Sequence, residues 1–196
     1  MKTYISLLRG INVNSQNRIR IPELKQVYES LKLLNVVTYI QSGNVIFDCT
    51  EQDPATIGRF LETEITRSFG LSVKVLLRDR DGFQEIIGSN PFENQRNEDP
   101  KKQYVTFLSE APEELALRNL VFHAAGDSVG SNFKRESEAG DEDEYFVYDR
   151  DIYLFCPNGY GRTKFSNIYF ESKLGLAATT RNWKTVNALY EMANQR

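Results

Sequence analysis

Apolar positions near the amino terminus form short runs that end at turn residues. The first run, from Tyr4 to Leu8, stops at Arg9-Gly10, which is typical of a buried strand that ends in a loop. Apolar residues then recur every three or four positions at 24–31 and 57–65, which predicts two amphipathic helices. Runs rich in β-branched residues, which indicate further strands, lie at 36–40, 45–47 and 73–77.

The resulting order of elements is strand, helix, strand, strand, helix, strand. This is the split βαβ pattern of ferredoxin-like folds, in which an antiparallel sheet carries its helices on one face. The first and second strands are then parallel, with the third between them. The end of the first strand and the turn before the third strand therefore lie at the same edge of the sheet. We predict an α+β fold whose ferredoxin-like half covers residues 1–95.

The second half shows a related series of patterns after a polar linker at 94–102. Strand runs lie at 104–108, 145–148 and 152–156, and helical segments at 112–122 and 166–174. We therefore predict a second α+β domain at 96–196 that ends in a C-terminal helix, with the domain boundary near residue 95. Residues 126–144 are rich in Gly, Ser and acids, which predicts a mobile connection.

The C-terminal helix is predicted from an apolar stripe that Trp183 begins, and the tryptophan itself is expected to pack in a core. Thr180 is its predicted N-cap, so Arg181 and Asn182 fall in the first helical turn. A cation is unfavourable at the positive end of the helix dipole. An arginine at that place therefore indicates an ion pair or a bound anion.

Composition restricts the class of protein. A chain of 196 residues that is 40% apolar is large enough for one large domain or two small ones. Two cysteines, Cys49 and Cys156, are too few for a disulfide framework and are expected as core thiols in a reducing cytosol. The sequence has neither an apolar run of membrane-spanning length nor a signal peptide, so a cytoplasmic protein without a membrane partner is expected.

The net charge of −3 is unevenly distributed along the chain. Residues 1–78 carry ten Lys and Arg against seven Asp and Glu, and residues 151–196 carry six against three. Residues 79–150 carry eight against seventeen. A positive face forms if the two ends of the chain meet in space. The alternative is that the acidic middle serves only to keep the protein in solution.

Polar residues gather where strands end and where helices begin, and these are our candidates for a ligand site. Arginine offers a fixed fork of donors and amides offer both donors and acceptors, a combination that holds an anion or the edge of a nucleobase. The glycine-containing loop at 157–164 adds two cations at the entrance of a helix. The predicted ligand-binding residues are Arg9, Asn12, Gln41, Ser42, Asn44, Arg162, Lys164, Arg181 and Asn182.

Several chemistries are not supported by the sequence. The single histidine, His123, argues against histidine catalysis and against a zinc site. The consecutive acids at 141–144 lack the spacing of a calcium loop and are expected to be a solvated charge run. The loop at 157–164 has neither phosphate-loop nor dinucleotide-loop spacing, and no nucleophile elbow occurs. We predict no metal and no cofactor, and we assign no catalytic residues.

Five motifs resemble a bacterial family catalogued as domain of unknown function 1697. They are Leu8-Arg9-Gly10-Ile11-Asn12-Val13, Gln41-Ser42-Gly43-Asn44-Val45, Pro157-Asn158-Gly159 with Gly161-Arg162 and Lys164, Lys173-Leu174-Gly175, and Ala178-Thr179-Thr180-Arg181-Asn182-Trp183. The resemblance covers nearly the whole chain. It implies a cytosolic α+β fold and no established activity.

The chain departs from that family in two places. Where members have two glycines and a lysine after the Ile-Asn-Val segment, this chain has Asn14-Ser15-Gln16, which argues against a phosphate cradled by the backbone of that loop. The acidic tract at 136–144 is also longer.

Three functions are compatible with these observations. Our prediction is a cytosolic module that binds a phosphate-bearing ligand, a nucleotide or a nucleic acid, at a cleft between the two halves. The second is an enzyme that acts on a small polar metabolite with a carboxylate base. The third is that these polar residues are purely structural and join the two halves, with Arg9 and Arg181 as partners.

Overall fold

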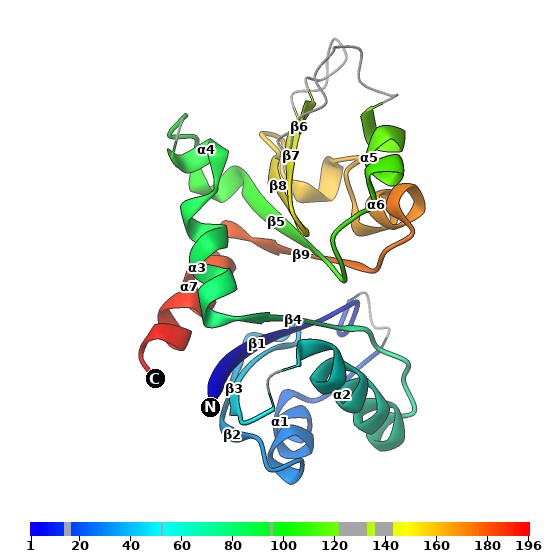
Figure 1. Ribbon diagram of the computed structural model, residues 1–196, viewed down its shortest axis with the longest axis vertical. Coiled ribbons are helices and arrows are strands. Elements are labelled where there is room, and N and C mark those ends of the chain that lie inside the picture. The colour runs from blue at the N-terminus through cyan, green and yellow to red at the C-terminus, as the bar shows by residue number, and fades with distance from the viewer. Residues whose placement is uncertain (14–16, 52, 95, 122–132, 136–142) are drawn as a thin grey trace. The chain divides into compact units, whose positions relative to one another are not determined.

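The computed structural model describes residues 1–13, 17–51, 53–94, 96–121, 133–135 and 143–196 (Figure 1). They divide into two compact units: unit 1 comprises Met1–Glu85 with Asn187–Arg196, and unit 2 comprises Ile86–Val186. This division differs from the predicted domains 1–95 and 96–196, because it falls inside helix α3 (Arg80–Gly88) and helix α7 (Trp183–Asn194). Each unit is an α+β structure, as predicted.

Unit 1 has the predicted order of strands and helices. Its elements are β1 (Lys2–Leu8), α1 (Ile21–Ser30), β2 (Leu34–Tyr39), β3 (Asn44–Cys49), α2 (Pro54–Phe69) and β4 (Val75–Asp79). The strands form one sheet in the order β2-β3-β1-β4, and every neighbouring pair is antiparallel. Strands β1 and β2 are therefore parallel with β3 between them, which confirms that the end of β1 lies beside the β2–β3 turn.

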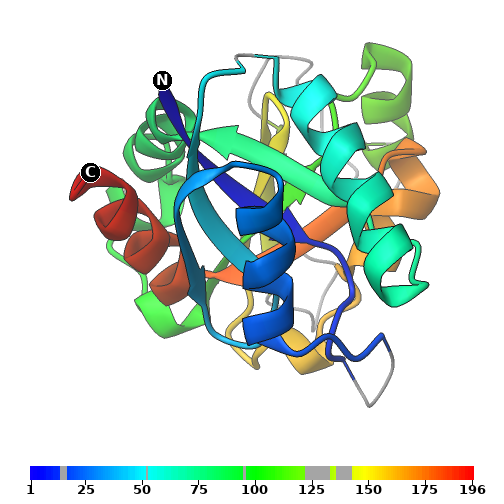
Figure 2. The ribbon, with the colours of Figure 1, turned by 90° about the horizontal axis from the view of Figure 1, so that it is seen from below.

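Helices α1 and α2 cover one face of this sheet (Figure 2). The core beneath them contains Leu24 and Tyr28 of α1, which lie on the predicted stripe, together with Ile57 and Leu61 of α2. The Tyr28 hydroxyl and the Ser6 Oγ atom form a buried hydrogen bond of 2.7 Å that joins α1 to β1. Burial without a charged partner raises the pKa of Tyr28, so its hydroxyl keeps its proton.

The ends of α2 follow from its sequence. The Asp53 carboxylate accepts hydrogen bonds from the backbone N–H groups of Ala55 and Thr56, and so caps the helix at its start. Gly70 ends it in the left-handed conformation at φ 67°. Both features confirm the predicted boundaries of this helix.

The β2–β3 turn differs in one detail from a simple turn of glycine and asparagine. Positive φ angles occur at Ile40 (51°) and Gly43 (74°), whereas Asn44 already belongs to strand β3. A β-branched residue rarely adopts this conformation, so the surrounding contacts must hold Ile40 in place.

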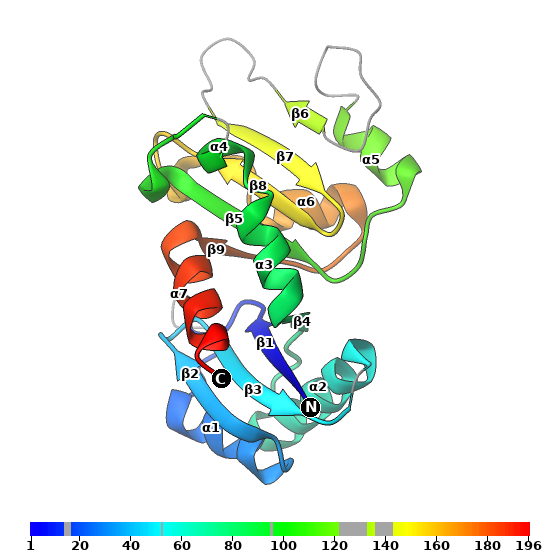
Figure 3. The same cartoon turned by 60° about the vertical axis from the view of Figure 1, so that its left-hand side comes forward.

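Unit 2 contains a second antiparallel sheet. Its strands are β5 (Gln103–Leu108), β6 (Phe133–Arg135), β7 (Glu144–Tyr148), β8 (Asp151–Phe155) and β9 (Ala178–Asn182), in the order β6-β7-β8-β5-β9 (Figure 3). Helices α5 (Glu114–Val121) and α6 (Asn167–Leu174) contribute Leu120, Phe170 and Leu174 to the core on one face. The short helices α4 (Pro91–Asn94), η1 (Pro100–Lys102) and η2 (Tyr160–Arg162) complete the unit.

The prediction that Arg181 and Asn182 begin a helix is wrong. They end strand β9, which pairs with β5 so that Thr180 lies opposite Thr106. The β-branched threonines favour this extended conformation. Helix α7 begins at Trp183, and its N-cap is Asn182 rather than Thr180, because the Asn182 Oδ1 atom accepts a 2.8 Å hydrogen bond from the Thr185 N–H. The argument from the helix dipole therefore does not apply to Arg181.

Arg96 organises the start of unit 2 through its guanidinium group. The group lies 5.6 Å from the centre of the Phe92 ring and 6.0 Å from that of Phe155. It donates hydrogen bonds to the carboxylates of Glu98 and Glu144, and these partners raise the pKa of Arg96. Glu144 ends the acidic tract predicted to be solvated, so part of that tract is bound into the fold.

Other predictions made for this region fall partly outside the described residues. Asp143 is described and buried, whereas residues 136–142 of the acidic tract, His123 and most of the predicted mobile connection are not described. Asn14-Ser15-Gln16 also lie outside. The prediction of a core thiol is confirmed for Cys156, which is free and buried, whereas Cys49 is free and half-buried. In the described part of the chain, no helix has the length and apolar character needed to cross a bilayer.

Candidate functional site

Asn12 holds the loop after β1 against the β2–β3 turn. Its amide Nδ2 donates to the carbonyl oxygens of Ile19 (2.9 Å) and Gln41 (2.8 Å), and its Oδ1 accepts from the Ile19 N–H (2.9 Å). The residue has a φ of 56°, a left-handed conformation that asparagine tolerates better than most residues. We call this set of contacts the Asn12 clasp. Both donors of the Asn12 amide are used inside the protein.

Gly43 packs directly against the same loop. A side-chain Cβ at this position would lie 2.6 Å from Ile11 Cδ1 and 2.8 Å from Leu8 Cβ, distances that real atoms do not adopt. The carbonyl oxygen of Gly43 also accepts a 2.9 Å hydrogen bond from the Leu8 N–H. Only glycine offers both the close approach and the φ of 74°. The first two sequence motifs are therefore in direct contact, with Gly43 of the second packed against Leu8 and Ile11 of the first.

A hydrogen bond between their side chains joins Asn44 to Ser42 within the same turn. The Asn44 Nδ2 donates to the Tyr39 carbonyl oxygen and to the Ser42 Oγ atom, both at 3.0 Å. Asn44 is buried and Ser42 half-buried. The structure thus brings Asn12 to Gln41 and Ser42 to Asn44, but the amides of Asn12 and Asn44 serve the turn itself.

Two arginines that the sequence prediction did not include lie beside the Asn12 clasp. Arg18 and Arg20 flank Ile19, which is buried, and both arginines are exposed. Arg9 lies at the end of β1, is half-buried, and donates its backbone N–H to the Lys74 carbonyl oxygen at 2.9 Å. A signal for them was present in the sequence, because Met1 to Pro22 includes Lys2 and these three arginines but no Asp or Glu.

Helix α1 begins directly after this basic segment. Arg20 is its N-cap residue, and an arginine side chain has only donors, so it cannot accept from the amides of the first turn. The helix dipole and those amides make the start of α1 electropositive. Glu23 in the first turn opposes this charge: its carboxylate lies 3.5 Å from Arg20 Nη1 in an ion pair with both side chains exposed. Such exposed pairs exchange readily with other ions.

In unit 2, the loop after β8 is tied to strand β9 by hydroxyl groups. The Tyr160 hydroxyl donates to Thr180 Oγ1 at 3.0 Å, and Thr180 in turn donates to Asn167 Oδ1 at 2.6 Å. Thr106 Oγ1 lies 2.6 Å from Thr180 Oγ1. Burial raises the pKa of Tyr160, which keeps this hydroxyl neutral. Tyr160, which lies within the segment of the third motif, is therefore hydrogen-bonded to Thr180 of the fifth motif, and this contact belongs to the fold.

Arg181 and Asn182 do not present their side chains as predicted. Arg181 is only 7% exposed, and its Nη1 donates to Thr179 Oγ1 at 2.8 Å and to the Thr180 carbonyl oxygen at 2.9 Å. Burial lowers the pKa of Arg181 to about 10. Asn182 caps α7. The two cations of the preceding loop differ from Arg181, because Arg162 and Lys164 are both exposed and Lys164 Nζ lies 5.6 Å from the centre of the Phe165 ring.

The predicted residues thus fall into two sets. Arg9, Asn12, Gln41, Ser42 and Asn44 belong to unit 1, and Arg162, Lys164, Arg181 and Asn182 belong to unit 2. That the two sets share one cleft stays a prediction.

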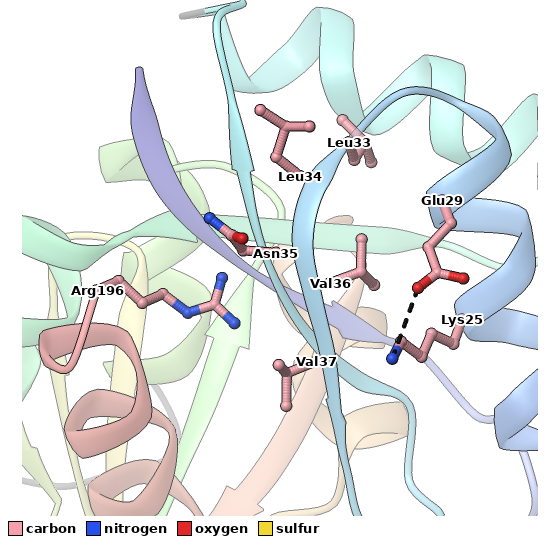
Figure 4. Close-up of a pocket in the computed structure, with 8 residues that line it drawn as sticks. All are labelled: Lys25, Glu29, Leu33, Leu34, Asn35, Val36, Val37 and Arg196. Carbon is pink, nitrogen blue, oxygen red and sulfur yellow. Dashed lines mark ion pairs between the residues drawn. The ribbon is translucent and has the colours of Figure 1, made fainter.

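Two depressions in unit 1 lie away from these residues. A shallow groove of about 490 Å³ runs beside α1 and β2 (Figure 4), and a smaller one of about 100 Å³ is lined by polar residues near Lys2 and Asp79. None of the predicted ligand-binding residues lines either depression. Among the residues that the structure describes, no three His, Cys, Asp or Glu side chains are grouped to hold a metal ion.

Comparison with known proteins shows the fold and the family. The conserved bacterial protein SP0830 from Streptococcus pneumoniae has a similar structure, with a TM-score of 0.68 and 22% sequence identity over 98% of each chain. At this identity the likeness concerns the fold. No curated protein matches the sequence. The model of the family described as protein of unknown function (DUF1697) matches residues 1–153, and the chain therefore belongs to that family.

Proposed function

We propose that unit 1 binds a phosphate-bearing ligand, a nucleotide or a nucleic acid, at the basic segment that leads into α1. Arg18 and Arg20 supply exposed guanidinium groups, and Arg9 and Gln41 lie at the adjoining strand end and turn. A cytoplasmic location, where such ligands are abundant and thiols stay reduced, is part of this proposal.

The observation that carries the proposal is that exposed positive side chains directly precede the first backbone amides of helix α1. Two exposed arginines directly precede a helix of ten residues whose N-cap residue has no acceptor. Oxyanions bind well where helix amides and guanidinium groups point at the same region. The stretch before Glu23 contains no carboxylate that would neutralise it.

The Asn12 clasp gives this segment a defined shape. By binding backbone groups of Ile19 and Gln41 with one amide, Asn12 fixes the backbone between Arg18 and Arg20 to the backbone of the β2–β3 turn. A prearranged set of donors loses less entropy on binding than donors on a loose loop. Asn12, Ser42 and Asn44 are therefore assigned to positioning, and Gln41 and the arginines to ligand contact.

The residues proposed to contact the ligand are arginines and a glutamine, and none of these can act as a general base. We therefore propose that unit 1 binds its ligand and does not catalyse a reaction on it. Phosphate contacts carry little sequence information, and binding of nucleic acid by this segment is expected to depend weakly on base sequence. In unit 2 the exposed Arg162 and Lys164 stay candidate phosphate contacts, whereas Arg181 and Asn182 are assigned to the fold.

The test measures binding of a fluorescent single-stranded oligonucleotide by anisotropy, and of ATP and inorganic phosphate by calorimetry, at low and at rising salt. The logarithm of the affinity for a single strand should fall with the logarithm of the salt concentration by about 0.7 per phosphate contact. The double variant Arg18→Gln/Arg20→Gln should weaken binding and reduce that slope by about 1.4.

The matched control is Arg59→Gln, which removes one exposed guanidinium from α2 in the same unit. It should leave the affinity and the salt slope nearly unchanged. If none of the three probes binds at low salt, or if the control weakens binding as much as the double variant does, the proposal is wrong.

A further inference from the structure

The outer edge of strand β2 is apolar and exposed. β2 is the terminal strand of the unit 1 sheet, so one row of its backbone N–H and C=O groups faces away from β3. Leu34 is 51% exposed and Val37 38% exposed, and Ile40 in the following turn is 50% exposed. Large apolar side chains in a row along a sheet edge are unusual in a protein that acts as a monomer.

The edge also lacks the charges that protect such strands. From Leu33 to Phe47 the sequence contains no Asp, Glu, Lys or Arg. Charged side chains, lysine above all, are the usual means of preventing another strand from pairing with an edge. The one irregularity is a shift in register between Leu34 and Val37, with Asn35 at a φ of 51°. Beyond it, residues 37–39 continue in regular register with β3.

A groove follows this edge (Figure 4). Its floor is apolar and includes Leu33, Val36 and Val37. On one side lie Lys25 and Glu29 of α1, which form an ion pair of 3.5 Å between Nζ and Oε1, and on the other side lies Arg196. Arg196 is already bound by Asp48, whose carboxylate lies 3.7 Å from its Nη1. Lys25 and Glu29 pair with each other but keep 43% and 50% of their side chains exposed, so they present one charge of each sign on the same side of one helix.

We propose that this groove is the interface with a second copy of the same chain, in which the two β2 strands pair antiparallel across a twofold axis. Such an interface requires a surface that complements itself. A twofold axis perpendicular to the sheet keeps both copies of α1 on one face and makes them antiparallel. Lys25 of one copy then faces the partner's Glu29, and Glu29 faces the partner's Lys25.

The paired charges favour a second copy over an unrelated extended peptide. A peptide would also use the free strand edge and the apolar floor, but it would have no fixed charges for Lys25 and Glu29. A second copy offers each residue a further partner of opposite charge and covers Leu34 and Val37 with the same residues of its partner. The proposal is independent of the ligand site, because none of these residues belongs to the basic segment before α1.

The test is the mass of the full chain in solution, measured by sedimentation equilibrium over a wide range of protein concentration. The wild-type chain should dimerise. Val37→Lys places a charge on the strand edge and should raise the dimer dissociation constant about tenfold or more. The control Ile168→Lys places the same charge on α6 of unit 2, where Ile168 is 72% exposed, and should leave the dimer unchanged.

A charge exchange tests the contact between the two α1 helices directly. Lys25→Glu puts four acids at the interface and should raise the dissociation constant roughly three- to thirtyfold, and Glu29→Lys should act similarly. The double variant Lys25→Glu/Glu29→Lys restores complementary pairs across the twofold axis and should recover most of the affinity. Circular dichroism of each variant reports whether it is folded.

Amide hydrogen exchange locates the interface. The amides of residues 36–39 should exchange more slowly as the protein concentration rises. A chain that stays monomeric at all concentrations overturns the proposal. So does a dimer that neither Val37→Lys nor either single charge reversal weakens, because its interface would then lie elsewhere. A monomer that binds an extended peptide at this edge would show that the groove has a different occupant.

Discussion

The interlocked contacts around Gly43 show what the first two motifs do at the level of single residues. Leu8, Ile11, Asn12 and Gly43 come from segments some thirty residues apart, yet they form one packed and hydrogen-bonded unit. Glycines and asparagines at turns are readily taken as ligand contacts, because both also occur where backbones approach bound anions. Here their partners lie within the protein, so their first role is to shape the turn.

The packing at Gly43 gives a prediction for stability. Gly43→Ala should lower the free energy of unfolding by about 2–4 kcal/mol, because the new methyl group must displace Ile11 and Leu8 and an L-residue is strained at this φ. Gly10→Ala is a matched control: Gly10 has a similar φ of 69°, but a Cβ there meets no atom within 4 Å. It should cost only about 1 kcal/mol. Urea unfolding measures both, and equal losses would show that packing at Gly43 contributes nothing.

At the level of elements, the strands and helices that periodicity predicts are found where apolar residues mark them clearly. Helix α2 follows its stripe between Asp53 and Gly70, and the two hairpins lie where β-rich runs flank turn residues. Periodicity does not indicate strand β9, because Ala178–Asn182 is short, polar and followed at once by α7. Its extended conformation depends on pairing with β5, a contact distant in sequence that local patterns do not encode.

The corrected boundary between β9 and α7 can be tested by changing the cap. Asn182→Ala removes the acceptor for the Thr185 N–H and should lower the free energy of unfolding by about 1 kcal/mol. Asn182→Asp keeps an oxygen at the same place, next to the positive end of the helix dipole, and should be close to wild type. Thermal unfolding followed by circular dichroism distinguishes them. If both variants lose the same stability, the Asn182 side chain does not act as the cap.

At the level of the whole molecule, local composition predicted the two α+β halves but placed their boundary differently. The polar linker near residue 95 suggests a division there, whereas packing assigns residues 86–94 to unit 2 and residues 187–196 to unit 1. Long-range packing decides such boundaries, and Arg196 bound to Asp48 is one example. Long-range contacts also decide which residues form the candidate site. Arg18 and Arg20 are candidates because Asn12 ties the backbone of the residue between them to that of Gln41, a contact distant in sequence.

The two proposals together make a prediction about ligand length. A dimer presents two basic segments, so an oligonucleotide long enough to reach both binds with avidity, whereas ATP or phosphate occupies one segment at a time. Val37→Lys should therefore weaken binding of a long single strand by about tenfold or more while leaving the affinity for ATP unchanged. Ile168→Lys adds the same charge without disturbing β2 and corrects for non-specific attraction. Anisotropy with oligonucleotides of increasing length measures the effect. If Val37→Lys binds oligonucleotides of every length as tightly as the wild type does, the two basic segments act independently of the dimer and the edge of β2 has no part in ligand binding.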